Sequence, residues 1–181
     1  MSLTLPLAGQ KLRASVLAAA FTAINDATDT LAGRVEVKYA YRDTNGTNTT
    51  TGEQGYLRLD NIPIVNGDLY LAVISPMIFQ SSAAGDLIQI LLRGSTSGAA
   101  TNASAALHLL ADTSQTAGGA QKTKGFTFRY QAGTTGNLSL RLSYLRFSGS
   151  GNVRINASSD IPVQMSVFRM GPGQADTGVD E

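Results

Sequence analysis

Apolar residues recur at every second position through most of the chain between residues 34 and 170. The pattern is clearest in two stretches, which are Val35, Val37, Tyr39 and Tyr41, and then Ile161, Val163, Met165 and Val167. A period of two places one row of side chains in a core and the other row outside. Gly, Ser, Thr and Asn residues interrupt the pattern at short intervals. We therefore interpret the chain as a β-sandwich.

The pattern divides this region into eight or nine strands. We expect them at residues 34–42, 55–64, 68–79, 86–93, 103–111, 124–131, 137–147, 152–157 and 161–169. Loops rich in small and polar residues are expected at 44–54, 94–102, 112–121 and 148–151. Because no helical periodicity separates the strands, an antiparallel sandwich or barrel is favoured over a βαβ fold.

The strand expected at 137–147 changes phase along its length. Leu138, Leu140, Leu142 and Tyr144 share one face, whereas Leu145 and Phe147 follow on the opposite parity. A β-bulge near Tyr144 would let both sets face the core. The alternative is a strand buried on both faces by a neighbouring subunit.

The first 33 residues differ from the rest and form a separate arm and helix in our division of the chain. Residues 1–14 are expected to be extended, and residues 16–31 have apolar residues at helical spacing, with Ser15 as N-cap and Gly33 as the stop. The helix either caps the sandwich or serves as a docking or oligomerisation element. We interpret residues 34–170 as the sandwich domain and 171–181 as a tail that a partner chain orders.

Composition excludes some classes of partner. The 14 basic and 13 acidic residues give a net charge of +1, so the basic excess that is typical of nucleic-acid binders is missing. The apolar part of residues 11–24 is far shorter than the roughly 20 residues needed to cross a bilayer. We therefore expect neither nucleic acid nor membrane as a partner. Only 15% of residues are charged, against roughly 25% in typical soluble domains. That weakly charged, polar exterior suits a subunit packed among neighbours.

Few residues offer chemistry. His108 is the single histidine, and it lies in an apolar stretch, where we expect it to be structural. With one histidine and no cysteine, the chain lacks the ligand set of a zinc site. The segment from Asp43 fails the EF-hand pattern, because Gly46 stands at the fourth position and Gln54 at the twelfth. We expect no catalytic residue, no cofactor and no metal, and hence no enzyme.

Arginines form a second candidate feature. The outward row of the later strands carries Arg129, Arg141 and Arg154, with Arg146 and Arg169 nearby. They either make up a solvated face or act as forked donors for carboxylates of an adjoining subunit.

Three stretches resemble tailed-phage virion proteins. Residues 5–17 (LPLAGQKLRASVL) resemble the start of many such proteins, and residues 57–64 (LRLDNIPI) resemble a strand of a β-rich family from phages of actinobacteria. Residues 148–153 (SGSGNV), followed by 163–168 (VQMSVF), resemble the closing hairpin of that family. The three stretches together comprise 33 of the 181 residues, and their order and spacing agree with those of the family.

This resemblance implies a virion structural protein with a jelly-roll-like sandwich of about eight strands. Members of this family are regarded variously as capsid decoration or minor capsid proteins, or as minor tail proteins. Our leading hypothesis is a capsid decoration (minor capsid) protein, made in the cytoplasm of the bacterial host and placed on the capsid surface, that binds the major capsid protein and itself as a homotrimer. The residues expected to bind the partner belong to the arm and helix and are Leu5, Leu7, Leu12, Leu17, Phe21 and Ile24. The alternatives are a minor tail or fibre protein that binds a receptor or carbohydrate, and a carbohydrate-binding module outside any virion.

Overall fold

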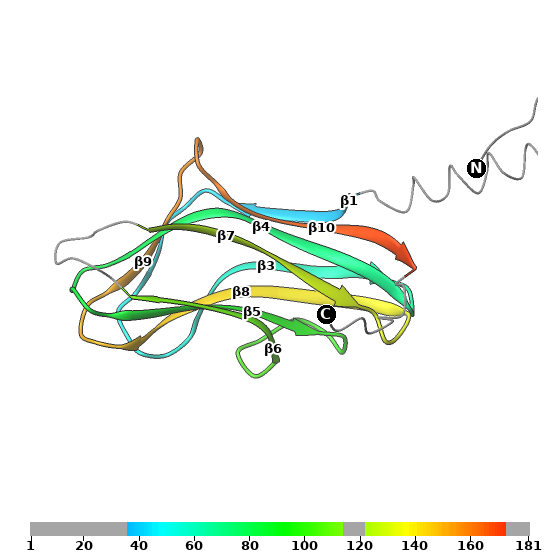
Figure 1. Cartoon of the computed structure of the whole chain (residues 1–181), viewed down its shortest axis with the longest axis horizontal. Coiled ribbons are helices and arrows are strands. Elements are labelled where there is room, and N and C mark those ends of the chain that lie inside the picture. The colour runs from blue at the N-terminus through cyan, green and yellow to red at the C-terminus, as the bar shows by residue number, and fades with distance from the viewer. Residues whose placement is uncertain (1–35, 114–121, 173–181) are drawn as a thin grey trace, which may run out of the picture.

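The computed structural model describes residues 36–113 and 122–172, which form strands and no helix (Figure 1). The strands of this part are β1 (Glu36–Arg42), β2 (Gly46–Asn48), β3 (Gln54–Ile64), β4 (Asp68–Ser81), β5 (Leu87–Ser95), β6 (Ala105–Thr113), β7 (Lys122–Gln131), β8 (Gly136–Ser148), β9 (Val153–Asn156) and β10 (Val163–Pro172). The expected arm, helix and tail lie outside the described residues, apart from the first two tail residues, which end β10.

Two antiparallel sheets pack face to face, as Figure 1 shows. One sheet has the order β1–β10–β4–β9–β2, with β7 on the other edge of β4, and the second has the order β3–β8–β5–β6. β10 pairs with residues 68–74 of β4, and β9 pairs with residues 78–81. Since β7 pairs with both parts of β4, β10 and β9 must follow one another along its opposite edge.

The order of the strands agrees with the jelly-roll-like sandwich expected from the resemblance. The chain passes from one sheet to the other between β3 and β4, β4 and β5, β6 and β7, and β7 and β8, whereas β5 and β6 are neighbours in one sheet. As a result, β1, β10, β4 and β7 lie in one layer and β3, β8, β5 and β6 in the other. Such connections are those of a jelly roll, which is built from eight strands in two sheets. β2 and β9 are an additional short pair at one end of the first layer.

Alternation along the strands builds the core between the sheets. Along β4, Tyr70, Ala72 and Ile74 are buried, whereas the residues between them are partly exposed. The in-phase residues expected to be internal in three other strands are also in the core, which confirms their assignment: Leu57 and Leu59, Ile88, Ile90 and Leu92, and Leu138, Leu140, Leu142 and Tyr144.

The expectation that Val37, Tyr39 and Tyr41 share one inner face of the first strand is wrong. A register shift between Glu36 and Lys38 inserts one residue into β1 relative to β10. Val37 and Ala40 therefore pack against the core, whereas Tyr39 and Tyr41 point outward and are 58% and 60% exposed. A bulge reverses the parity of all residues that follow it, because side chains alternate strictly between the two faces. In β10, Val163, Met165 and Val167 are buried as expected, but Ile161 precedes the strand and is exposed.

The bulge expected near Tyr144 does not bring Leu145 and Phe147 into the core. The register of β8 against β5 shifts between Leu87 and Ile88, which leaves Phe147 as the extra residue opposite them. Phe147 is 59% exposed, and Leu145 is partly exposed on the outer face. The bulge thus lies at Phe147, beyond Tyr144, which is the last core residue of β8.

The loop expected at 44–54 was also misjudged in part, because it contains β2, which pairs with β9. The other strands end within three residues of their expected positions, as far as these are described. Residues 114–121 of the expected loop at 112–121 lie outside the described part of the chain.

Replacing Leu142 by alanine should lower the free energy of unfolding by about 2–5 kcal/mol, because the fully buried side chain would leave a cavity between the sheets. Phe147→Ala on the same strand is the matched control and should change it by less than about 1 kcal/mol. Urea denaturation of both variants would measure the difference. Equal losses would show that β8 buries both residues.

Candidate functional site

His108 lies where the two sheets meet along one edge. It belongs to β6, and its ring stacks on Phe126 of β7 with centroids 4.7 Å apart and planes at 27°. The ring of Phe128 lies 6.3 Å away. Within the described residues, the imidazole makes no hydrogen bond to a side chain that could act as nucleophile or acid. The geometry is that of a partly buried packing residue joining two edge strands.

The residues expected to bind a partner through the arm and helix lie outside the described residues. These are Leu5, Leu7, Leu12, Leu17, Phe21 and Ile24, for which the expectation stays a prediction.

The arginines expected to form one row are divided between the sheets. Arg129 and Arg154 lie on strands of the β1–β10–β4 sheet, where each is paired with an outward residue of β4. Arg169 lies in β10 and donates from Nε to Asp68 Oδ2 at 2.5 Å. Arg141 and Arg146 belong to β8 of the other sheet, and Arg146 donates to the carbonyl oxygen of Gly151.

A different row of arginines crosses the outer face of the β3–β8–β5 sheet. Arg58 of β3 is the register partner of Arg141, and Arg141 is in turn the partner of Arg93 on β5. We call these three residues the arginine row. Like charges directly opposite each other destabilise a sheet, so the row requires compensating carboxylates. Arg58 Nε binds Asp60 Oδ2 at 2.6 Å in a partly exposed ion pair.

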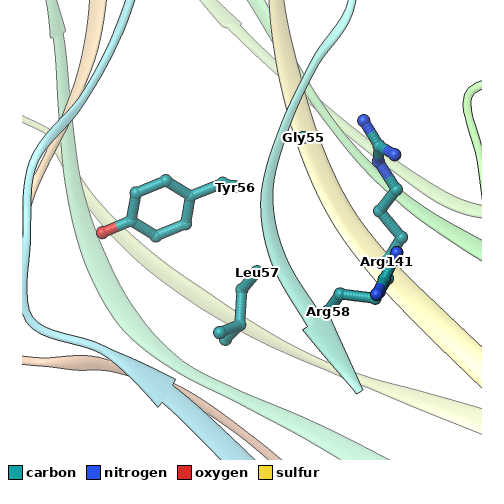
Figure 2. A pocket seen from close by; sticks show the side chains of 5 residues that line it. All are labelled: Gly55, Tyr56, Leu57, Arg58 and Arg141. Atoms are coloured by element: carbon teal, nitrogen blue, oxygen red, sulfur yellow. The ribbon is translucent and has the colours of Figure 1, made fainter. Parts of the chain in front are cut away.

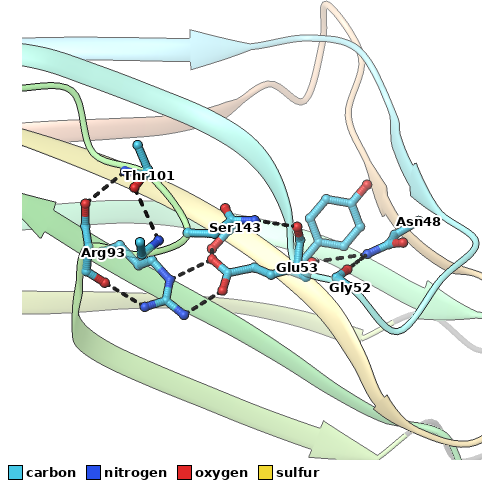
Figure 3. A network of polar contacts seen from close by, with 10 residues as sticks. Asn48, Gly52, Glu53, Arg93, Thr101 and Ser143 are labelled. Atoms are coloured by element: carbon cyan, nitrogen blue, oxygen red, sulfur yellow. Dashed lines mark hydrogen bonds and ion pairs between the residues drawn. The ribbon is translucent and has the colours of Figure 1, made fainter.

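Glu53 compensates the charge of Arg93 and ties several elements together (Figure 3). Arg93 donates from Nε and Nη2 to the two carboxylate oxygens at 2.7 and 2.6 Å, and Ser143 Oγ donates to Oε1. Arg93 Nη1 also donates to the carbonyl oxygen of Ser104, while Asn102 Nδ2 donates to that of Glu53. These bonds fasten the β5–β6 loop and the start of β3 to the outer face of the sheet.

The environment of Glu53 keeps its carboxylate charged. Burial by itself raises the pKa of Glu53. The hydrogen bonds from Arg93 and Ser143, and then the positive charges of Arg93 and Arg141, outweigh that effect and leave the pKa below its ordinary value of 4.5. The pair with Arg93 is well shielded, since the two side chains are 17% and 11% exposed.

Asp86 is a second shielded carboxylate, and its bonds close the opposite end of the sandwich. Its oxygens accept from Ser81 Oγ at 2.5 Å and from the backbone N–H groups of Ser150 and Gly151 at 2.9 and 2.8 Å. Burial raises the pKa of Asp86, but these bonds and the charge of Arg146 lower it below 3.8 overall. Because its oxygens are bound to the protein itself, Asp86 is a structural anchor between two loops.

A hollow of about 220 Å³ lies beside Arg141, lined by Gly55, Tyr56, Leu57, Arg58 and Arg141. It arises from a bulge in β3, where Tyr56 is the extra residue relative to β8. Tyr56 and Leu57 consequently both turn inward, whereas Arg58 and Arg141 lie on the other side of β3, as Figure 2 shows. Gly55 supplies no side chain to fill the space left on the outer face.

Within that hollow, the guanidinium of Arg141 lies against the backbone of Gly55. A Cβ atom on Gly55 would stand only 2.6 Å from Arg141 Cζ and Nε. Nε of Arg141 is buried without a hydrogen-bond partner, and among the described residues Arg141 forms no ion pair. The site therefore presents a partly buried cation in the lining of an open depression, and its donors make no hydrogen bond to the described residues.

Sequence reasoning had identified Arg141 but missed Arg58, Arg93 and Glu53. Arg58 and Arg93 belong to strands whose register against β8 is not evident from the sequence, Glu53 lies in the loop just before β3, and the bulge at Tyr56 shifts the parity of β3. The alternation of Arg58 with Leu57 and Leu59 was a signal for an outward position, but only the pairing of strands shows that the arginines are neighbours.

In the described residues, no group of three or more His, Cys, Asp or Glu side chains is arranged to hold a metal ion. Over residues 36–113 and 122–172, we find no helix that is both long and apolar enough to cross a membrane.

Neither a protein-family model nor a curated protein matches the chain. Solved structures with a similar arrangement include one described as "CBM4 structure and function" (10% identity, 76% of this chain and 78% of that chain, TM-score 0.36). Eiger TNF from S. frugiperda is 11% identical over 76% of this chain and 98% of that chain, with a TM-score of 0.38. The infectious bursal disease virus VP2 subviral particle is 12% identical over 74% of this chain but 37% of that chain, with a TM-score of 0.36. Since these TM-scores lie below 0.5, the similarities are too weak to indicate what this chain does.

The depressed pKa of Glu53 predicts a pH dependence of stability. A carboxylate whose pKa is lower in the folded state contributes stability above its ordinary pKa of 4.5, and loses it as the pH falls through the lower folded-state pKa. Glu53→Gln should reduce this acid-induced loss and, at neutral pH, cost about 1.5–3 kcal/mol, because Arg93 loses its partly buried charged partner. Unfolding free energies measured from pH 7 to pH 3 would check both effects.

Asp60→Asn is the matched control, because the Arg58–Asp60 pair is more exposed. It should cost less than about 1 kcal/mol at neutral pH. If Glu53→Gln and the wild-type protein lose stability in parallel on acidification, Glu53 does not contribute to the pH dependence.

Proposed function

We propose that this protein is a virion structural protein, and specifically a capsid decoration protein that binds the major capsid lattice and stabilises the shell. In this proposal it assembles as a homotrimer on the capsid surface, contacts neither nucleic acid nor membrane, and transforms no substrate. The arm and helix of residues 1–33 fasten it to the shell, and the sandwich projects outward.

The observation that carries this proposal is that several large or charged side chains of the described residues face outward. Large side chains such as Tyr39 and Phe147, and the cation of Arg141, lie on the open outer faces of the sheets. Outer faces of paired strands are rigid and broad, which suits contact with another protein surface. The resemblance of three stretches to phage virion proteins supports the assignment of that surface to a capsid.

Deleting residues 1–31 should abolish capsid occupancy while leaving the sandwich folded, because the proposed shell contacts are removed and the core residues are retained. Purified particles exposed to truncated and full-length protein would be compared on stained gels, and the fold followed by circular dichroism. Truncated protein that fills the particles as completely as the full chain would contradict the assigned role of the arm.

The same gels separate decoration from the alternative of a minor tail or fibre protein. A decoration protein is present in numbers comparable to those of the major capsid protein, whereas a tail component is present in a few copies. A low copy number in native particles would therefore favour a tail protein that binds a receptor or carbohydrate.

The proposal also gives His108 no chemical role. His108→Ala should leave capsid occupancy unchanged and lower the unfolding free energy, since it removes the stack on Phe126 and the tilted ring contact with Phe128. His108→Phe is the matched variant, because it keeps an aromatic ring without a titratable group. Loss of function in both variants at unchanged stability would contradict a packing role.

A further inference from the structure

The arginine row contains one arginine without an ion-pair partner among the described residues, although its charge also acts on Glu53 from a longer distance. Arg58 pairs with Asp60, and Arg93 pairs with Glu53, whereas Arg141 between them has no ion-pair partner among the described residues. Each of its strand neighbours is another arginine. Repulsion between these neighbouring arginines destabilises the sheet. A negative group that approached Arg141 from outside would reduce this repulsion.

The shape of the site selects a flat, singly charged group. The guanidinium of Arg141 lies against Gly55 and belongs to the lining of the hollow. Its Nε is buried, so the terminal Nη groups are the donors left for a ligand. A carboxylate can accept two hydrogen bonds from these two groups. Phosphate suits the site less well, because its second charge would face the carboxylates of Asp60 and Glu53 on either side of the row.

Arg141 differs from other arginines of the described chain that also have a buried, unpartnered Nε. Arg146 and Arg154 share this property, but neither lines the hollow. Arg146 in addition uses another donor to bind Gly151. The combination of unused donors and an adjoining space is thus found at Arg141.

We propose that Arg141 binds a carboxylate side chain of a neighbouring copy of this chain, which enters the hollow beside Gly55. A single ion pair open to water binds weakly, so the carboxylate must be presented by a larger surface. The chain has such groups to offer, since Glu36, Asp43 and Asp160 are exposed and form no ion pair with other described residues. A contact between two different patches of identical chains can close a ring such as a trimer when the rotation between copies permits it. This inference rests on the proposed self-association.

The first test probes the site without requiring assembly. The Nε–H resonances of the arginines in the full chain would be followed by NMR during titration with sodium acetate, with sodium chloride and sodium phosphate as parallel arms. The Arg141 signal should shift with acetate and approach saturation only at about 0.1 M or above, as expected for a single weak charge-assisted contact. Arg154 in the same spectrum is the internal control and should not respond.

The second test asks whether a second copy supplies the carboxylate. Sedimentation of Arg141→Gln should show self-association weakened by at least about tenfold and less sensitive to salt than in the wild type. Arg141→Lys, which keeps the charge but not the fork, should lie in between, and Arg154→Gln should behave as the wild type. Gly55→Ala should weaken association as well, because its Cβ displaces the guanidinium. Thermal melting would verify that each variant is folded.

The outcomes separate this inference from the proposed function. Acetate binding at Arg141 with unchanged self-association of Arg141→Gln would overturn the assignment to a second copy while leaving a carboxylate site. Absence of an acetate response, or a response shared equally by Arg154, would overturn the site itself. A wild-type chain that stays monomeric at all concentrations would overturn both the trimer and the proposed occupant, whereas capsid binding would be judged separately by the occupancy of particles.

Discussion

The two sheets are held together by one core, into which the inner row of every long strand projects. Tyr70, Phe79 and Tyr144 are among its largest fully buried side chains, and burial of such apolar area is the main favourable contribution to folding. Since β4 pairs with three other strands, a loss of packing along it would loosen most of the first sheet. Because the inner residues of each strand are packed in this core, the outer faces of the sheets are rigid. The spacing between the arginines of the row is fixed by the same packed strands.

Polar side chains near the loops complement the core in two different ways. Asp86 is enclosed by donors from its own chain, and Glu53 is enclosed by Arg93 and Ser143, so both carboxylates serve to hold segments together. Arg141 lies in the same sheet as Arg93 but lacks such enclosure. The contrast arises locally, because the bulge at Tyr56 and the absence of a side chain on Gly55 open a space that is filled elsewhere on the sheet.

Much of the fold was predictable from the sequence, since alternation marks strands wherever one face is buried. It identified the inner rows of β3, β5 and β8 correctly. It could not detect β2, which has three residues and depends on β9 for its pairing. It also misplaced Tyr39 and Tyr41, because the bulge near Val37 is set by pairing with β10 and leaves no mark in the composition of the strand.

The candidate site was predictable only in part for the same reason. Arg141 was recognised as an outward arginine, yet its grouping with Arg129 and Arg154 was wrong because those residues belong to the other sheet. Its true neighbours, Arg58 and Arg93, are fixed by registers between strands distant in the sequence. The bulge in β1 has one more consequence. Among the described strands, β1 lies at an edge of its sheet, and the outward backbone groups of an edge strand can pair with a strand of another molecule. Because a bulge locally disrupts such pairing, the irregularity that turns two tyrosines to the surface also makes this edge a poorer template for uncontrolled polymerisation.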